Sequence, residues 1–118
     1  MQKTELNNIY NSTFICYVDI PTTYPHYIIT AWNPYSEQVA IEQNRAANIE
    51  LEALLQSPSK LTNYGKCIGS SRFGEWQEES YWVTCLNEEM IKSLGRTYKQ
   101  NAIYKAKSPY DIQVIWLC

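Results

Sequence analysis

The stretch EQVAIEQNRAANIELEALLQ, residues 37–56, has the periodicity of an amphipathic α-helix, and it decides how the rest of the chain is interpreted. At 100° per residue, its apolar residues gather within an arc of roughly 140°, while most of its glutamates and glutamines lie outside that arc. Pro58 closes the helix. The same arc also contains Asn44 and Asn48, and Arg45 lies just beside it. A stripe that should face the core therefore carries two amides.

Asn44 and Asn48 must find hydrogen-bond partners if they are buried, because a buried amide without partners costs ~1–3 kcal/mol. Two interpretations remain open. In the first, the amides tie down a neighbouring loop, such as the turn at Asn33 and Pro34. In the second, this helix face borders a pocket and the amides bind a ligand. Both interpretations predict that replacing either asparagine by alanine destabilises the protein.

Paired segments with strand character surround the long helix. Two precede it and two follow it, and a short helix capped by Asn87 separates them from a last pair. The adjacent pairs suggest hairpins and an α+β fold in ββαββαββ order, with a mainly antiparallel sheet and two helices packed on one face. We expect one domain over residues 1–118. The expected strands are residues 12–19, 26–32, 78–86, 101–106 and 111–117, with residues 64–74 as a strand with turns or a loop.

The composition is that of a globular protein, with 45% hydrophobic and 19% charged residues and a net charge of −2. The sequence lacks the apolar segment of a signal peptide and any apolar run that could span a membrane, so we expect a cytoplasmic protein. Its four cysteines form no CxxC pair, and its single histidine, His26, is distant from them in sequence. We therefore expect reduced thiols, no metal and no cofactor.

The pair Glu78 and Glu79 lies on an otherwise aromatic strand. Because side chains alternate along a strand, Glu78 and Ser80 share one face with Trp82, and Glu79 points to the other face. One glutamate then points to the less exposed side, unless both faces are solvated there. A carboxylate beside aromatic rings can have a raised pKa and act as a general acid or base. The alternative is a solvated residue at the end of a strand. Gln100 similarly precedes an otherwise apolar strand.

The segment from Lys92 to Lys107 contains five basic residues and no acidic one, with two tyrosines between them. A basic strip with aromatic residues can follow a phosphate backbone. The alternative interpretation is that its first cations complement the dipole at a helix C-terminus.

Four segments resemble, in order, a bacterial family of unknown function, DUF3293. They are Ile29-Thr-Ala-Trp-Asn-Pro34, Asn44-Arg-Ala-Ala-Asn48, Trp76-Gln-Glu-Glu-Ser80 and Gly95-Arg-Thr-Tyr-Lys-Gln100-Asn-Ala. Each segment alone is a weak signal, but the ordered set covers most of the chain from about residue 12 to residue 115. The resemblance implies no activity. It points to Thr30, Asn33, Asn44, Asn48, Glu78, Ser80, Arg96 and Gln100. Glu79 stands where the family often has proline, which leaves the choice of key carboxylate between Glu78 and Glu79 open.

Three functions are compatible with these residues, and whether the protein is an enzyme stays undecided. The first is a binding module for a small ligand, a nucleotide or a protein partner, because amides recognise ligands through paired donors and acceptors. Its site would comprise Thr30, Asn33, Asn44, Arg45, Asn48, Glu78, Ser80, Arg96 and Gln100. The second is a small hydrolase or nuclease-like enzyme, with Glu78 or Glu79 as general base and Arg45 or Arg96 stabilising charge. The third is nucleic-acid binding through the Lys92–Lys107 strip. His26 is a poor catalytic candidate, because we expect it to be an ordinary surface imidazole.

Overall fold

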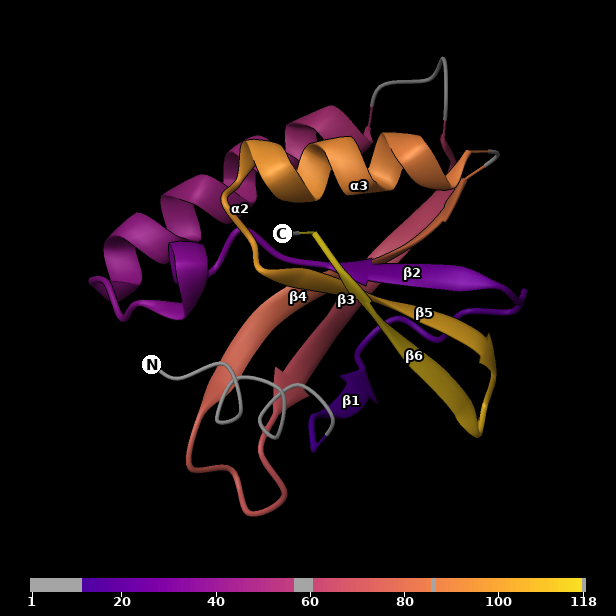
Figure 1. Cartoon of the computed structure of the whole chain (residues 1–118), viewed down its shortest axis with the longest axis horizontal. Coiled ribbons are helices and arrows are strands. Elements are labelled where there is room, and N and C mark those ends of the chain that lie inside the picture. Colours follow the sequence, from indigo (N-terminus) through magenta and orange to yellow (C-terminus); the bar gives the residue numbers. More distant parts are fainter. Residues whose placement is uncertain (1–11, 57–60, 86, 118) are drawn as a thin grey trace.

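Six strands form one antiparallel sheet in the computed structural model, which describes residues 12–56, 61–85 and 87–117 (Figure 1). The spatial order of the strands is β1-β3-β4-β2-β5-β6. The predicted α+β class and the ββαββαββ order are confirmed. The strands are β1 (Phe14–Tyr17), β2 (His26–Ile29), β3 (Leu61–Ser70), β4 (Gln77–Cys85), β5 (Ala102–Ser108) and β6 (Asp111–Trp116).

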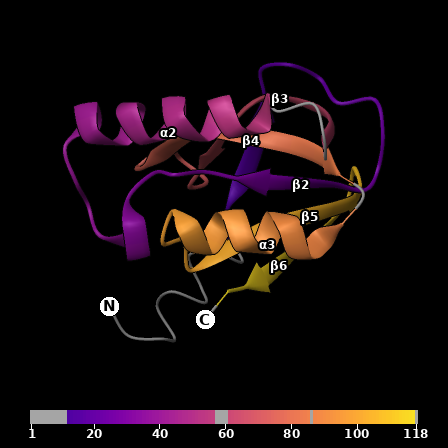
Figure 2. The same cartoon turned by 90° about the horizontal axis from the view of Figure 1, so that it is seen from above.

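Two helices, α2 (Ile41–Leu55) and α3 (Glu88–Thr97), lie side by side over one face of this sheet (Figure 2). Helix α2 contacts β4, and α3 contacts β2 and β5. The main core fills the space between the two layers. It includes Leu51 and Leu55 from α2, Ile91 from α3, and Ile29, Val83 and Ile103 from the sheet. Within the described residues, no helix is long and apolar enough to cross a membrane.

The beginning of α2 differs from the prediction, because the helix starts at Ile41 and not at Glu37. Pro34–Ser36 instead form a 3-10 turn, η1, in which Asn33, Tyr35 and Ser36 have φ values of 45°, 55° and 62°. These left-handed conformations, rare for residues other than glycine, turn the chain out of a continuous helix. Helix α3 begins as predicted, since the Asn87 side chain accepts a hydrogen bond from the Glu89 backbone N–H.

The expected hairpin of the first two strands is wrong. Strand β1 pairs with β3, whereas β2 lies between β4 and β5. Burial explains the difference, because all four residues of β2 are buried and every residue of β1 is exposed or half-buried. A fully buried strand needs a hydrogen-bonded neighbour on each side, while β1 suits the edge of the sheet.

A second, smaller core lies on the sheet face away from the helices, where Ile28, Cys67 and Trp82 are buried. Trp82 lies opposite Gly65 in the β3–β4 pairing, and its Nε1 donates to the Asp19 carbonyl oxygen at 2.6 Å. A Cβ on Gly65 would lie 2.5 Å from the indole ring, so the ring occupies the space of the missing side chain. The glycine is therefore required by packing.

His26 is part of this face and corrects the expectation of a surface imidazole, because its exposed fraction is 0%. Its Nδ1 donates to the Thr23 carbonyl oxygen, and its Nε2 accepts from the Tyr17 hydroxyl. Burial lowers the pKa of His26, which favours the neutral ring that this bonding requires.

We predict that Gly65→Ala displaces the Trp82 ring and breaks its hydrogen bond to Asp19. Overpacking of this kind costs ~1–3 kcal/mol, which lowers the melting temperature by several degrees. Gly69→Ala in the same strand is the matched control, because a Cβ there would meet its nearest neighbour at an ordinary 3.7 Å. Thermal unfolding followed by circular dichroism compares the two variants. Equal melting temperatures would contradict the packing role of Gly65.

Candidate functional site

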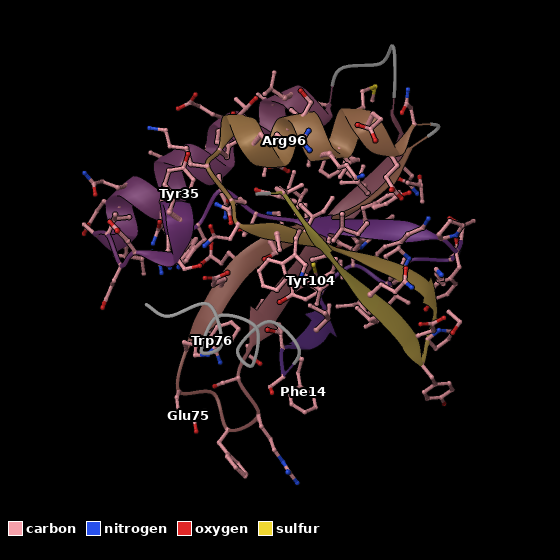
Figure 3. All side chains as sticks on the ribbon, viewed as in Figure 1. Phe14, Tyr35, Glu75, Trp76, Arg96 and Tyr104 are labelled. Atoms are coloured by element: carbon pink, nitrogen blue, oxygen red, sulfur yellow. The ribbon has the colours of Figure 1, made fainter. Side chains whose placement is uncertain are left out.

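The sheet face away from the helices contains a cavity of about 200 Å³. Its walls come from strands far apart in the sequence, together with the loop around Asn33 and the residue before β5. Ile15, Ile28 and Ile29 form its aliphatic part, and Trp76 and Tyr104 contribute aromatic rings. Figure 3 shows Trp76 and Tyr104 below both helices. The remaining lining residues are small or polar: Thr13, Thr30, Asn33, Ser36, Gly69, Glu78, Ser80, Gln100 and Ala102.

Strand register explains why these residues meet. Ile28 pairs with Trp82 on one side and with Tyr104 on the other, so the three side chains share a face. Two residues further along β4, on the same face, comes Ser80, and then Glu78. Glu78 pairs with Gly69 of β3, which has no side chain to fill the space in front of the carboxylate.

Glu78 is the polar residue with the most unusual surroundings. Burial raises the pKa of its carboxyl group to about 7. Within the described part of the chain, its carboxylate has no hydrogen-bond or ion-pair partner, whereas the neighbouring Glu79 is half exposed and pairs with Arg45. Lone buried carboxylates are disfavoured in the ionised state, and such groups occur preferentially at functional sites. The two glutamates that the sequence left as alternatives therefore differ in the structure: Glu78 lines the cavity, and Glu79 pairs with Arg45 at the surface.

The loop at one end of the cavity is held by the two buried asparagines of α2. Asn48 accepts a hydrogen bond from the Ala31 N–H and donates to the Glu79 carbonyl oxygen, at 2.8 and 2.7 Å. Asn44 accepts from the Asn33 N–H and donates to the Asn33 side-chain oxygen, at 2.8 and 2.9 Å. These four hydrogen bonds tie the loop to α2, as the first interpretation of the asparagines predicts.

Two further amides, Asn33 and Gln100, line the cavity with part of their bonding capacity unused. Gln100 donates through Nε2 to the carbonyl oxygens of Trp32 and Tyr98, which leaves Oε1 as an acceptor. Asn33 accepts through Oδ1 from the Val39 N–H and from Asn44, which leaves Nδ2 as a donor. Neither Gln100 Oε1 nor Asn33 Nδ2 forms a hydrogen bond with a described residue. Among the described residues, every fully buried polar side-chain atom has a partner, so these two atoms are at least partly exposed. Both groups therefore remain accessible to a bound molecule.

The cavity brings together five of the nine residues proposed from the sequence, namely Thr30, Asn33, Glu78, Ser80 and Gln100. Asn44 and Asn48 support the loop from behind. Arg45 lies on the surface beside Glu79, and Arg96 Nε donates to the Leu117 carbonyl oxygen, so neither arginine lines the cavity.

The sequence analysis missed Thr13, Ser36, Trp76 and Tyr104 as lining residues. Trp76 belongs to one of the four segments that resemble the family, but the sequence alone does not indicate that its side chain faces the site. Tyr104 could have been found from strand alternation, because it lies two residues after Ala102 and four after Gln100. Ser36 and Thr13 could not be identified from the sequence, because only the left-handed turn and the β1–β3 pairing bring them to the cavity. No three described His, Cys, Asp or Glu side chains are grouped so that they could hold a metal ion.

Two of the five basic residues from Lys92 to Lys107 are paired with an acidic group. Lys92 and Lys105 both pair with Glu88, whose carboxylate also accepts a hydrogen bond from the Tyr27 hydroxyl. The hydrogen bonds to Tyr27 and Lys105 lower the pKa of Glu88. These lysines therefore serve a local charge cluster between α3 and the sheet.

The fold and the cavity define an α+β domain whose curled antiparallel sheet carries two helices on one face and a small polar pocket on the other. Residues 29–103, more than half of the chain, match the family described as "Protein of unknown function (DUF3293)", and the chain belongs to this family. No curated protein and no solved structure matches the chain. The matched range includes Asn33, Glu78 and Gln100, three cavity residues with unused bonding capacity.

We predict that Glu78 makes the stability of the protein depend on pH. A pKa of about 7 against an ordinary 4.5 means that the folded state binds the proton more tightly than the unfolded state. The free energy of unfolding should therefore fall as pH rises from about 4.5 to 7, by up to ~3 kcal/mol, and then level off. Urea unfolding at several pH values measures this slope.

Glu78→Gln should lose this part of the pH dependence and be more stable than wild type at pH 8. Glu79→Gln, which changes the adjacent but half-exposed carboxylate, should retain it. Identical pH profiles for wild type and Glu78→Gln would show that the Glu78 carboxylate is adequately solvated.

We also predict that Asn48→Ala destabilises the protein by ~1–3 kcal/mol, because the buried Ala31 N–H loses its acceptor. The exposed Gln43→Ala on the same helix is the control and should change stability by less than ~0.5 kcal/mol. Urea unfolding measures both variants. An Asn48→Ala protein as stable as the control would mean that the loop is held by other contacts.

Proposed function

We propose that this protein is a binding module for a small molecule, which it takes up in the cavity between Trp76, Tyr104 and Glu78. The observation that carries the proposal is the Glu78 carboxylate, which faces an open cavity without a partner from the described chain. Ligand pockets typically combine apolar walls with a few polar groups that fix orientation. This cavity has both components.

The energetic cost of Glu78 supports a functional role. A glutamate with a raised pKa destabilises the folded protein at neutral pH, and a neutral side chain at the same position would avoid the cost. Proteins tolerate such local conflicts mainly at functional sites. The strained loop adjacent to the cavity supports the same conclusion, because Asn33 and Ser36 line the cavity and have left-handed backbone conformations.

A glutamate-dependent enzyme is the second candidate, and the pKa of Glu78 near 7 favours it, since a general acid or base works best near the operating pH. The accompanying roles proposed for Arg45 and Arg96 have no support, because neither residue lines the cavity. Ser80 lies two residues away, but its hydroxyl donates to the Glu78 backbone oxygen and no described histidine lines the cavity to activate it. Binding therefore accounts for more of the geometry than catalysis does.

Thermal unfolding against a panel of small metabolites tests the binding function. A ligand at a hundred times its dissociation constant adds ~2.7 kcal/mol, which raises the melting temperature by several degrees in a domain of this size. Gly69→Val should abolish this shift, because its side chain would enter the space in front of Glu78 without altering a polar group. The exposed Ile49→Val on α2 should leave it unchanged.

A shift that persists in a folded Gly69→Val protein would place binding outside the cavity. No shift with any compound of the panel would contradict small-molecule binding and direct the search to a protein partner.

A further inference from the structure

We propose that the ligand of this cavity is a small organic cation, a protonated amine attached to a group of about one ring in size. The inference rests on the proposed binding function of the same cavity and specifies its chemical class. It follows from the charge, the hydrogen-bonding groups, the aromatic walls and the volume of the site.

The charge of the cavity selects against anions. Glu78 is the one carboxylate among the described lining residues, and no lysine, arginine or histidine is among them. Within the part of the lining that the structure describes, Tyr104 on β5 is the only other side chain that can ionise. A phosphate or carboxylate ligand would find no positive charge on the described lining residues to replace its lost hydration, which is costly in a partly closed site. An ammonium group would instead supply Glu78 with the counterion that the described residues do not provide.

The free hydrogen-bonding positions favour a ligand that donates. Glu78 offers two carboxylate oxygens and Gln100 offers Oε1, all of them acceptors without a described donor. The orientation of the Gln100 amide is fixed, because both of its N–H groups donate to backbone carbonyl oxygens at 3.1 and 3.2 Å. An ammonium group has up to three donors and no acceptor, so it complements these oxygens. The Asn33 side-chain N–H and the Trp76 indole N–H are donors without a described acceptor, and they leave room for an acceptor elsewhere on the ligand.

The aromatic walls add a second attraction for a cation. Trp76 immediately precedes β4 and Tyr104 belongs to β5 (both labelled in Figure 3), and both line the cavity. The faces of tryptophan and tyrosine rings attract ammonium groups by ~0.5–2 kcal/mol, more when the site is shielded from water. The same rings and the nearby Ile15 and Ile28 provide apolar contact for the rest of the ligand.

The volume limits the size of the ligand. A cavity of ~150 Å³ in another protein accommodates benzene, and this cavity measures about 200 Å³. One ring with a short amine-bearing arm fills such a space. A complete nucleotide is larger and carries the anionic phosphate that the cavity does not accommodate.

Three probes of nearly equal shape separate the charge classes: benzylamine as the cation, benzyl alcohol as the neutral molecule and benzoate as the anion. Each is titrated into the whole protein at pH 8 while amide chemical shifts are followed by NMR. We expect benzylamine to shift the amides of Glu78, Gln100 and their neighbours, and to bind at least tenfold more tightly than benzyl alcohol. Benzoate should bind more weakly still.

Glu78→Gln should weaken benzylamine at least tenfold while leaving benzyl alcohol within twofold of wild type, and Glu79→Gln should change neither. Benzylamine binding to wild type should weaken on lowering the pH from 8 to 6, because the carboxylate of Glu78 then takes up a proton while a primary amine stays protonated.

The outcomes distinguish this inference from the function on which it rests. If benzoate or benzyl alcohol bound as tightly as benzylamine and shifted the cavity amides, the ligand would not be specifically a cation. The proposal that the cavity binds small molecules would still hold. Benzylamine binding that is unaffected by Glu78→Gln would overturn the assignment of the counterion. No shift at cavity amides with any of the three probes, at concentrations that saturate weak fragments, would count against both proposals.

Discussion

Two amide side chains on one helix hold the loop on which the site depends. Asn44 and Asn48 are spaced four residues apart on α2, so they project side by side toward the chain segment that leaves β2. Their four hydrogen bonds fix the backbone of Ala31 and Asn33 and join it to the Glu79 carbonyl oxygen on β4. Leucines at these positions would pack against the sheet, but they could not satisfy the backbone groups of a loop that has left the sheet ladder.

This loop is also hydrogen-bonded to the segment between α3 and β5, which contributes Gln100 to the cavity. The Trp32 carbonyl oxygen accepts from Gln100, and the Tyr35 N–H donates to the Lys99 carbonyl oxygen at 2.6 Å. The end of α3 and the start of β5 are thereby tied to the segment that α2 already holds. The free oxygen of Gln100 and the free amide nitrogen of Asn33 are consequently oriented by groups in the helical layer, although they face the opposite side. Binding in the cavity and packing of the helices are thus connected through one short segment.

The fold class and much of the site could be predicted because their signals are periodic. Helical periodicity located α2, and strand alternation placed Glu78 and Ser80 on the face of Trp82, opposite to Glu79. Pairing of β1 with β3 could not be predicted from local patterns, because the β1 sequence is compatible with any neighbouring edge. The left-handed turn at Asn33, Tyr35 and Ser36 was equally inaccessible, since two of these residue types rarely adopt that conformation and tertiary hydrogen bonds impose it. The roles of Asn44 and Asn48 needed the positions of their backbone partners, which are distant in sequence.

The contact between Gly65 and Trp82 also constrains how this chain can change during evolution. The indole ring stands where any side chain at position 65 would have to be, so the two positions are coupled. Substitutions at them are accessible in one order: the tryptophan must first give way to a smaller residue, and only then can the glycine acquire a side chain. A smaller residue at position 82 would also remove the hydrogen bond to the Asp19 carbonyl oxygen, while the bonds between Asp19 and Lys66 would remain. The history of these two neighbouring strands is therefore expected to show linked changes at positions 65 and 82, and not independent drift at each.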